Sequence, residues 1–244
     1  MKRIQRLWAL LSCILPLSAS AEVFSLSGDF DHNNNPNAGG WSYFNNSSLL
    51  PNQVPLNNGN ALYPAVLPRF FATGPNLNTD TPMVIKAGVN GSSAGETDAD
   101  FLQGDILIHS PNSATSILTV QWTAPEAGSI DFTSDIWYAH SVVNRANAVS
   151  IFLNSTPLGS ATISRTSYSN RNNPWRVALN DVAVNAGDTL RFQFQKSAGQ
   201  TVGSLNGVAV TVDFTPIPEP GTATLLLIGG GFLGLMSRLR SGRP

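Results

Sequence analysis

The sequence predicts an all-β fold, an antiparallel β-sandwich, over residues 22–215. Several segments alternate apolar and polar residues, as strands with one buried face do, and residues 208–214 are the clearest case. Asn, Gly and Pro residues of the kind found in turns separate these segments, and no long stretch places apolar residues at helical spacing. Short alternating strands joined by turns are typical of a two-sheet sandwich.

The alternation also predicts which side chains face the core. Residues 118–123 place Leu118, Val120 and Trp122 on one face, so Trp122 is expected to be buried. In residues 130–138 the apolar residues oppose a polar face on which Trp137 stands out. Further strands are predicted at 24–26, 81–87, 104–111, 149–153, 190–195 and 208–214. Residues 22–100 are rich in Asn, Gly, Pro and Ser, which predicts a loop-rich first part.

The charge of the predicted domain argues against nucleic acid as a partner. The chain has 14 Lys and Arg residues and 15 Asp and Glu residues, but six of the basic residues and one acidic residue lie in its two ends. Residues 22–215 keep 8 basic and 14 acidic residues, a net charge of −6. Nucleic-acid binding depends on neutralising phosphates. A neutral polysaccharide, or an anionic one bridged by a cation, is the better partner.

The first 21 residues have the three parts of a secretory signal peptide. Basic residues at the start precede the apolar run 7–17, and Ala19-Ser20-Ala21 supplies the small residues of a cleavage site. We expect export by the Sec machinery and cleavage by signal peptidase after Ala21. The only cysteine, Cys13, lies in this segment, so the exported domain has neither a disulfide nor a thiol.

Residues 216–244 form a second membrane-directed segment. A short motif, Pro218-Glu219-Pro220, precedes a transmembrane helix predicted at about 221–237 and a basic end with Arg238, Arg240 and Arg243. The uncharged stretch 223–236 reaches roughly 21 Å as a helix at about 1.5 Å per residue, less than a hydrocarbon core of roughly 30 Å. The arginines favour a cytoplasmic C-terminus. The tail therefore suits a stop-transfer pause better than a lasting anchor.

This order of tripeptide, apolar helix and basic end resembles the PEP-CTERM sorting tail of Gram-negative bacteria that make extracellular polysaccharide. The resemblance implies that an exosortase, a membrane protease-transpeptidase, recognises residues 218–220 and removes the helix. The resemblance further implies that the protein is an intermediate in the inner membrane before it reaches the cell surface or the biofilm matrix. An ordinary single-span anchor is the alternative.

Two internal segments resemble the β-sandwich domain of exported PEP-CTERM proteins. Residues 35–44 are similar to an Asn-Pro-Asn-Gly-x-Trp-Ser-Tyr element, with Ala38 and Gly39 in place of a single Gly. Residues 118–128 are similar to a Val-x-Trp-Thr-Ala-Pro-x-Ala-Gly strand. The resemblance implies a jelly roll similar to galactose-binding-like and carbohydrate-binding modules.

Six side chains are candidates for carbohydrate binding, because flat rings stack on sugar rings and planar polar groups meet hydroxyls. They are Trp41, Tyr43, Trp137, Tyr168, Arg171 and Trp175. The alternative for Trp41 and Tyr43 is that they fix a loop to the core. For the polar stretch 164–174 the alternative is a mobile loop, after which Trp175 opens a core strand.

Two acidic alternations offer the oxygen ligands that suit a structural Ca²⁺ ion. The first comprises Asp29, Asp31 and Asn33, and the second comprises Glu96, Asp98 and Asp100. Asn34 stands where an EF-hand loop needs Gly, which excludes an EF-hand. A plain solvated loop is the alternative for both clusters, and no other cofactor is expected.

Catalysis finds little support in the sequence. Glu126 lies in a predicted turn without an evident acidic partner, and His32, His109 and His140 accompany no nucleophile motif. We therefore predict a non-enzymatic surface or matrix protein associated with extracellular polysaccharide. It is either a carbohydrate-binding module with a defined site or a structural, adhesive protein without a specific ligand. A polysaccharide-active enzyme is the less favoured alternative.

Overall fold

The computed structural model describes residues 20–56, 59–60, 63–64, 69–77, 79–91, 99–140 and 143–217. Within them, Glu22–Phe214 forms one compact unit built of antiparallel strands, as the alternation predicts. The predicted signal peptide cleaved after Ala21 and the sorting tail with its transmembrane helix fall mostly or wholly outside the described residues. Within that part of the chain, no helix has both the length and the apolar character needed to cross a bilayer.

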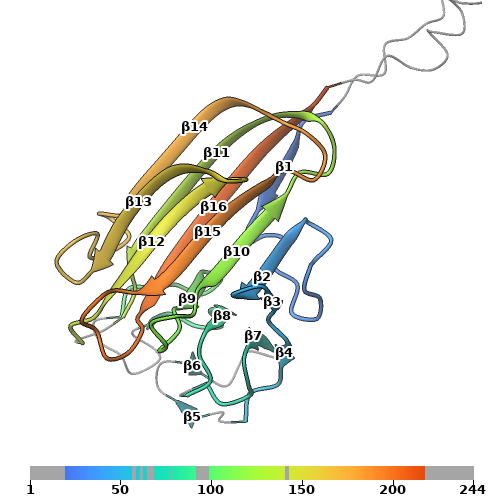
Figure 1. The fold of residues 1–244 in the computed structure, drawn as a ribbon. Helices are drawn as coiled ribbons and strands as arrows, with labels where there is room; N and C mark the ends of the chain where they lie inside the picture. Colours follow the sequence, from blue (N-terminus) through green and yellow to red (C-terminus); the bar gives the residue numbers. More distant parts are fainter. Residues whose placement is uncertain are drawn as a thin grey trace, which may run out of the picture. The chain divides into compact units, whose positions relative to one another are not determined.

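One sheet has six strands (Figure 1). Their order across the sheet is β13 (Thr156–Ser164), β12 (Ala146–Leu153), β15 (Thr189–Lys196), β10 (Leu118–Thr123), β2 (Trp41–Asn45) and β3 (Ser48–Leu49). Neighbouring strands are antiparallel throughout.

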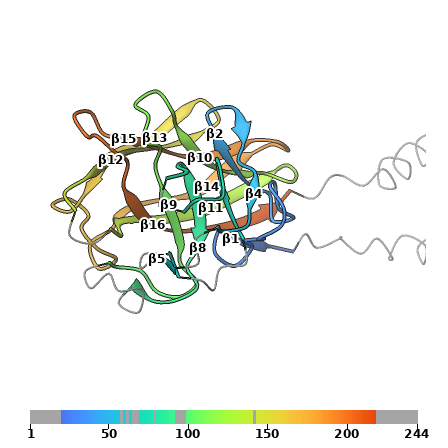
Figure 2. The same cartoon turned by 90° about the horizontal axis from the view of Figure 1, so that it is seen from below.

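The other large sheet has eight strands. Its order is β14 (Trp175–Val184), β11 (Gly128–Tyr138), β16 (Leu205–Pro216), β9 (Ile106–His109), β8 (Met83–Lys86), β7 (Phe70–Ala72) and β4 (Asn52–Gln53), and β1 (Glu22–Ser25) also pairs with β16. A separate pair joins β5 (Gly59–Asn60) to β6 (Tyr63–Pro64). Figure 2 shows the two large sheets as two layers, the arrangement of a jelly-roll β-sandwich.

The main core lies between these two sheets. On β10, Leu118, Val120 and Trp122 are fully buried, and each lies opposite a buried residue of β15. The ring centroids of Trp122 and Phe24 are 5.4 Å apart, so β1 packs against the middle of the core. The expected burial of Trp122 is therefore confirmed.

A second core covers part of the outer face of the eight-stranded sheet. It joins side chains of β7, β8, β9, β11 and β16 to residues of the connecting segments: Phe70, Ala72, Leu77, Met83, Ile85, Ala87, Phe101, Leu107, Trp137, Ala139 and Leu205. The loop-rich first part of the chain thus supplies short strands that form a packed layer. The same layer buries the side chain of Trp137.

One long strand has no counterpart in the prediction. β13 follows the turn at Asn154, which has a φ of 54°, and most of its nine residues are small or polar, apart from Leu158 and Ile163. Its alternation is weak because Gly159, Ser160 and Ala161 differ little in polarity. Its pairing with β12 holds it in place, and propensity contributes little.

Candidate binding groove on the six-stranded sheet

Trp137 lies on the polar face of its strand, as the alternation predicts, but it is not exposed there as a stacking surface for a sugar ring. Its indole ring lies flat against β16 at Gly207, where a Cβ atom would come within 2.2 Å of ring carbons. Its Nε1 donates to the Asp100 carbonyl oxygen at 2.7 Å, and the Arg171 guanidinium lies 5.0 Å from the ring centroid. The ring is only 3% exposed, so the prediction that it stacks on a sugar is wrong.

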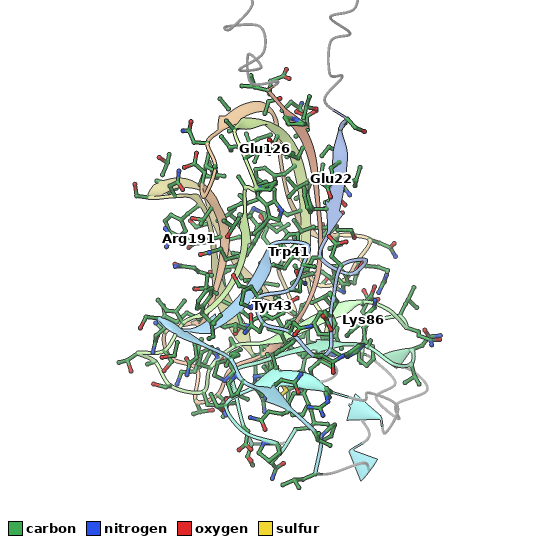
Figure 3. All side chains as sticks on the ribbon, turned by 90° about the vertical axis from the view of Figure 1, so that its right-hand side faces the viewer. Glu22, Trp41, Tyr43, Lys86, Glu126 and Arg191 are labelled. Carbon is green, nitrogen blue, oxygen red and sulfur yellow. The ribbon has the colours of Figure 1, made fainter. Side chains whose placement is uncertain are left out.

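Trp41 and Tyr43 are also core residues. Both are fully buried on β2, and Figure 3 shows them within the body of the domain. Tyr43 lies 5.0 Å from Phe71 and 5.8 Å from Phe30, and burial raises the pKa of its hydroxyl. A sugar cannot reach either ring, so the carbohydrate prediction is wrong for this pair and the alternative of a loop fixed to the core is correct.

The segment 165–174 is attached to the domain by the residues predicted to bind sugar. The Arg171 Nε donates to Asp100 at 3.0 Å, and its terminal nitrogen donates to Asp105 at 2.5 Å. The Tyr168 carbonyl accepts from the Tyr138 amide at 2.8 Å. Tyr168 is half-buried and packs against the main core. The structure therefore brings Trp137 and Arg171 together as a clamp.

Trp175 opens β14, as the structural alternative for this segment predicts. Its ring carbon Cζ2 lies 3.2 Å from the position that a Cβ atom would take at Gly159. The half-buried indole therefore fills the space between the β13 and β14 edges of the two sheets.

The acidic side chains considered as calcium ligands shape turns and ion pairs. Asp29 accepts from the Ser25 amide at 2.8 Å, and Asp31 accepts from the Asn33 amide at 2.8 Å. The hydrogen bond from the Asn34 side chain is the main reason that the pKa of Asp31 is lowered. Asp100 pairs with Arg171. Within the described ranges no group of three or more His, Cys, Asp and Glu side chains could hold a metal ion. Calcium at Glu96 and Asp98 stays a prediction, because both lie outside those ranges.

A groove of about 410 Å³ opens on the outer face of the six-stranded sheet. Strands β2, β3 and β10 form its floor, and the loop before β2 forms one wall. Its lining residues are Pro36, Asn37, Gly40, Ser42, Phe44, Leu49, Gln121 and Thr123. None of these side chains is ionisable.

The wall of the groove is built by the Asn-Pro-Asn element. The Asn37 side chain accepts from the Trp41 amide at 3.0 Å and donates to the Asp29 carbonyl at 2.8 Å, which fixes the loop. Gly40 has a φ of +76°, and a Cβ atom there would lie 3.0 Å from the Thr123 carbonyl oxygen. Glycine is therefore needed where the loop enters the strand and closes onto β10.

The floor combines a polar row with an apolar patch. The Gln121 amide donates to the Thr123 hydroxyl at 3.3 Å, and the Ser42 hydroxyl lies 3.5 Å from the Gln121 carbonyl oxygen. Next to them are the half-buried Phe44 ring and the Leu49 side chain, which is 45% exposed. Amides and hydroxyls can bond ligand hydroxyls, and an apolar ring can contact C–H groups. The groove can therefore bind a ligand, and its lining residues include no ionisable acid or base that could activate the Ser42 or Thr123 hydroxyl.

These lining residues were missed because sequence reasoning favoured the large aromatic residues. Trp41, Tyr43 and Trp122 alternate with Ser42, Phe44 and Gln121. The two sets point to opposite faces of one sheet. The available signal was the outward half of the same alternation, Ser42, Phe44 and Gln121, which contains no tryptophan or tyrosine.

The C-terminal segment indicates how the protein is exported. Residues 216–241 match the family model described as the PEP-CTERM protein-sorting motif. The chain carries a PEP-CTERM sorting signal. This signal indicates export through an exosortase with a membrane-anchored intermediate. The match covers the tail only, so the β-sandwich has to be understood from its own residues.

Solved structures share parts of the sandwich at low similarity. The C-terminal family 6 carbohydrate-binding module of LamC, a marine laminarinase from Zobellia galactanivorans, has 15% identity and a TM-score of 0.26, over 44% of this chain and 79% of that one. A family 35 carbohydrate-binding module from Clostridium thermocellum has 17% identity and a TM-score of 0.28, over 53% and 86%. The PRD1 vertex protein P5 has 12% identity and a TM-score of 0.27, over 39% and 65%. No curated protein matches the chain. Such distant likenesses say nothing about what this domain binds.

Proposed function

We propose that this is a non-enzymatic exported protein that an exosortase processes and that associates with extracellular polysaccharide at the surface or in the matrix of a Gram-negative bacterium. The sorting motif supports the route of export. The groove on the six-stranded sheet is the proposed point of contact with the polysaccharide. The observation that carries this proposal is a concave surface of amide, hydroxyl and apolar groups with no ionisable side chain.

The uncharged lining favours a neutral glycan over an acidic one. Gln121, Thr123 and Ser42 offer hydrogen-bond donors and acceptors without a charge that would require a counterion. Phe44 and Leu49 supply the apolar surface that the C–H face of a sugar ring needs. Arg191 lies next to Gln121 in register on the neighbouring strand, but its guanidinium donates to the Asn154 carbonyl oxygen and is not among the lining residues. A neutral segment of polysaccharide is the ligand that fits this chemistry.

Affinity electrophoresis tests the groove. Residues 22–217, which contain both cores, are run through gels that hold the polysaccharide of the host or a neutral β-glucan. We expect the wild-type domain to be retarded and Phe44→Ala with Gln121→Ala to weaken binding at least 10-fold, about 1.4 kcal/mol. Gln193→Ala is the matched control, since Gln193 lies on the same sheet face outside the groove.

Two results would overturn the groove proposal. The first is a wild-type domain that migrates freely in every neutral polysaccharide tested. The second is retardation that the double variant and the Gln193→Ala control share equally. Thermal melts of all three proteins show whether any loss of binding reflects loss of folding.

The sorting route is tested by the C-terminus of the exported protein. We expect mass spectrometry of protein recovered outside the cell to find peptides up to the end of β16 and none from residues 221–244. Replacing Glu219 with Ala should keep the full-length chain in the membrane fraction. Extracellular protein with an intact C-terminus in both strains would argue against processing.

A further inference from the structure

The edge strands of the two large sheets differ in how well they are protected. β1, which among the described strands pairs with β16 alone, has four residues and carries Glu22. β3 and β4 are edges of two residues each. β14 is long, but it carries Arg176 and Asp181, has a φ of +55° at Asp181, and shifts register against β11 between Ile130 and Phe132. β13 has nine residues and not one charged side chain. Among these described edges only β13 is both long and free of charged residues, and its proline and register shift are confined to its start.

An open edge strand displays unpaired N–H and C=O groups that can bind another strand. Natural proteins usually block such pairing with short strands, charged residues or bulges. β13 pairs with β12 alone, and no backbone hydrogen bond joins it to another strand within the described residues. From Gly159 onward β13 has neither a charged side chain nor a proline nor a register shift, and this lack of protection calls for an explanation.

A regular stretch of this edge is available for pairing. The register shift opposite Ile151 and Phe152 affects only the start of β13, next to Pro157. From Gly159 onward the strand is regular, until the Ser164 amide turns back to donate to the Ser167 carbonyl at 2.9 Å. Residues 159–163 remain, and Ser160 and Thr162 are exposed on the outer face.

We propose that β13 binds the β13 strand of a second copy of this chain in antiparallel orientation. A two-fold axis at Ala161 would place Ser160 of one copy opposite Thr162 of the other, so the contact is self-complementary. No charged residues meet across it, and Arg165 lies beyond its end, opposite the uncharged Pro157.

The pairing would join two six-stranded sheets into one. It would also bring the outer faces of the two six-stranded sheets together on one side of the dimer, with one groove on each copy. The inference is independent of the proposed glycan binding, because it rests on the strand edge and not on the groove. If both hold, two linked grooves would raise the avidity for a polymer without new contacts.

Sedimentation equilibrium of residues 22–217 tests the proposal. We expect a dimer whose fraction rises with protein concentration and with salt, since salt screens repulsion between two acidic domains. Ser160→Lys with Thr162→Lys should give a monomer, because lysines would face lysines across the two-fold axis. The control is Thr133→Lys with Ala209→Lys, which adds the same charge at exposed positions on interior strands.

Cysteine pairing provides a second readout. The sequence has one cysteine, Cys13, in the leader, so residues 22–217 have none. Ser160→Cys mixed with Thr162→Cys should form a disulfide-linked dimer under mild oxidation, and Thr133→Cys mixed with Ala209→Cys should not. A wild type that stays monomeric up to millimolar concentration, or a lysine variant that still dimerises, would overturn the proposal. If the domain dimerises but is not retarded by any polysaccharide, the β13 pairing is supported and the proposed glycan binding is not.

Discussion

The two outer faces of the sandwich differ in cover and in charge. Across the six-stranded sheet, one row runs through Ser42, Gln121, Arg191 and Phe152, and Arg191 lies 5.6 Å over the Phe152 ring. No acidic side chain lies on these strands. The eight-stranded sheet is covered at one end by the second core. Its other end carries exposed or partly exposed acidic residues, namely Asp131, Asp135 and Asp213. Figure 3 places Arg191 and Glu22 toward opposite sides of the domain.

This difference separates binding from stability. The outer face of the six-stranded sheet has polar groups and a groove, and no layer of described residues covers it, so a neutral polymer can contact it without displacing other residues. The covered half holds Trp137 and the Arg171 clamp, whose partners lie in segments distant in sequence. A substitution should therefore affect either binding or folding, depending on which face it alters.

The strongest expected effect comes from opening the covered face. Trp137→Ala removes the ring that fills the space above Gly207 and frees the Asp100 carbonyl, so we expect a loss of about 3–5 kcal/mol in the free energy of unfolding. Urea titration monitored by circular dichroism measures it. Glycan retardation of the remaining folded protein should be unchanged, because Trp137 lies outside the groove.

Two arginines provide the control for this experiment. Arg171→Ala leaves the Trp137 ring in place but removes its cover and the ion pairs to Asp100 and Asp105, so a smaller loss of about 1 kcal/mol is expected. The exposed Arg176 pairs with Asp135, and Arg176→Ala should leave the unfolding midpoint unchanged. Equal losses for Trp137→Ala and Arg176→Ala would contradict the division into two faces.

The sequence was informative wherever one strand alternates cleanly. Leu118, Val120 and Trp122 are buried as predicted, since a strand with one apolar face can satisfy it only against another sheet. Strand β13 was missed because its residues are small and weakly patterned. The fold class and the sorting tail could thus be predicted from local patterns alone.

The candidate site could not be predicted in the same way. Alternation placed Trp137 on the polar face of its strand, which is correct, but it could not show that Phe70, Phe101 and Leu205 cover that face. Likewise, Arg171 looked free in a polar loop, while its carboxylate partners lie 66 and 71 residues away. Such long-range cover depends on tertiary packing, which single-strand periodicity does not contain.

Low pH should lower the stability of the fold but should not change ligand binding at the groove. Burial lowers the pKa of His109 to about 4, with Arg145 adding to the effect, and burial with Arg145 and His109 lowers the pKa of His140 to about 4. His109 pairs in register with Met83 and Leu205 of the second core. Unfolded histidine has a pKa of about 6.5, so the unfolded chain binds protons first as the pH falls. Stability is therefore complete above about pH 6.5 and decreases toward pH 4.

Between pH 7 and pH 5 the loss should be roughly 2 kcal/mol for each histidine. Urea unfolding at pH 7, 6 and 5 measures it, and His109→Asn with His140→Asn should flatten the profile. The groove lining has no ionisable side chain, so retardation of the folded wild type in neutral polysaccharide should be the same at pH 7 and pH 5. An affinity that changes with pH while the stability does not would contradict this division, because the groups that titrate would then have to lie at the groove, where no described lining residue is ionisable.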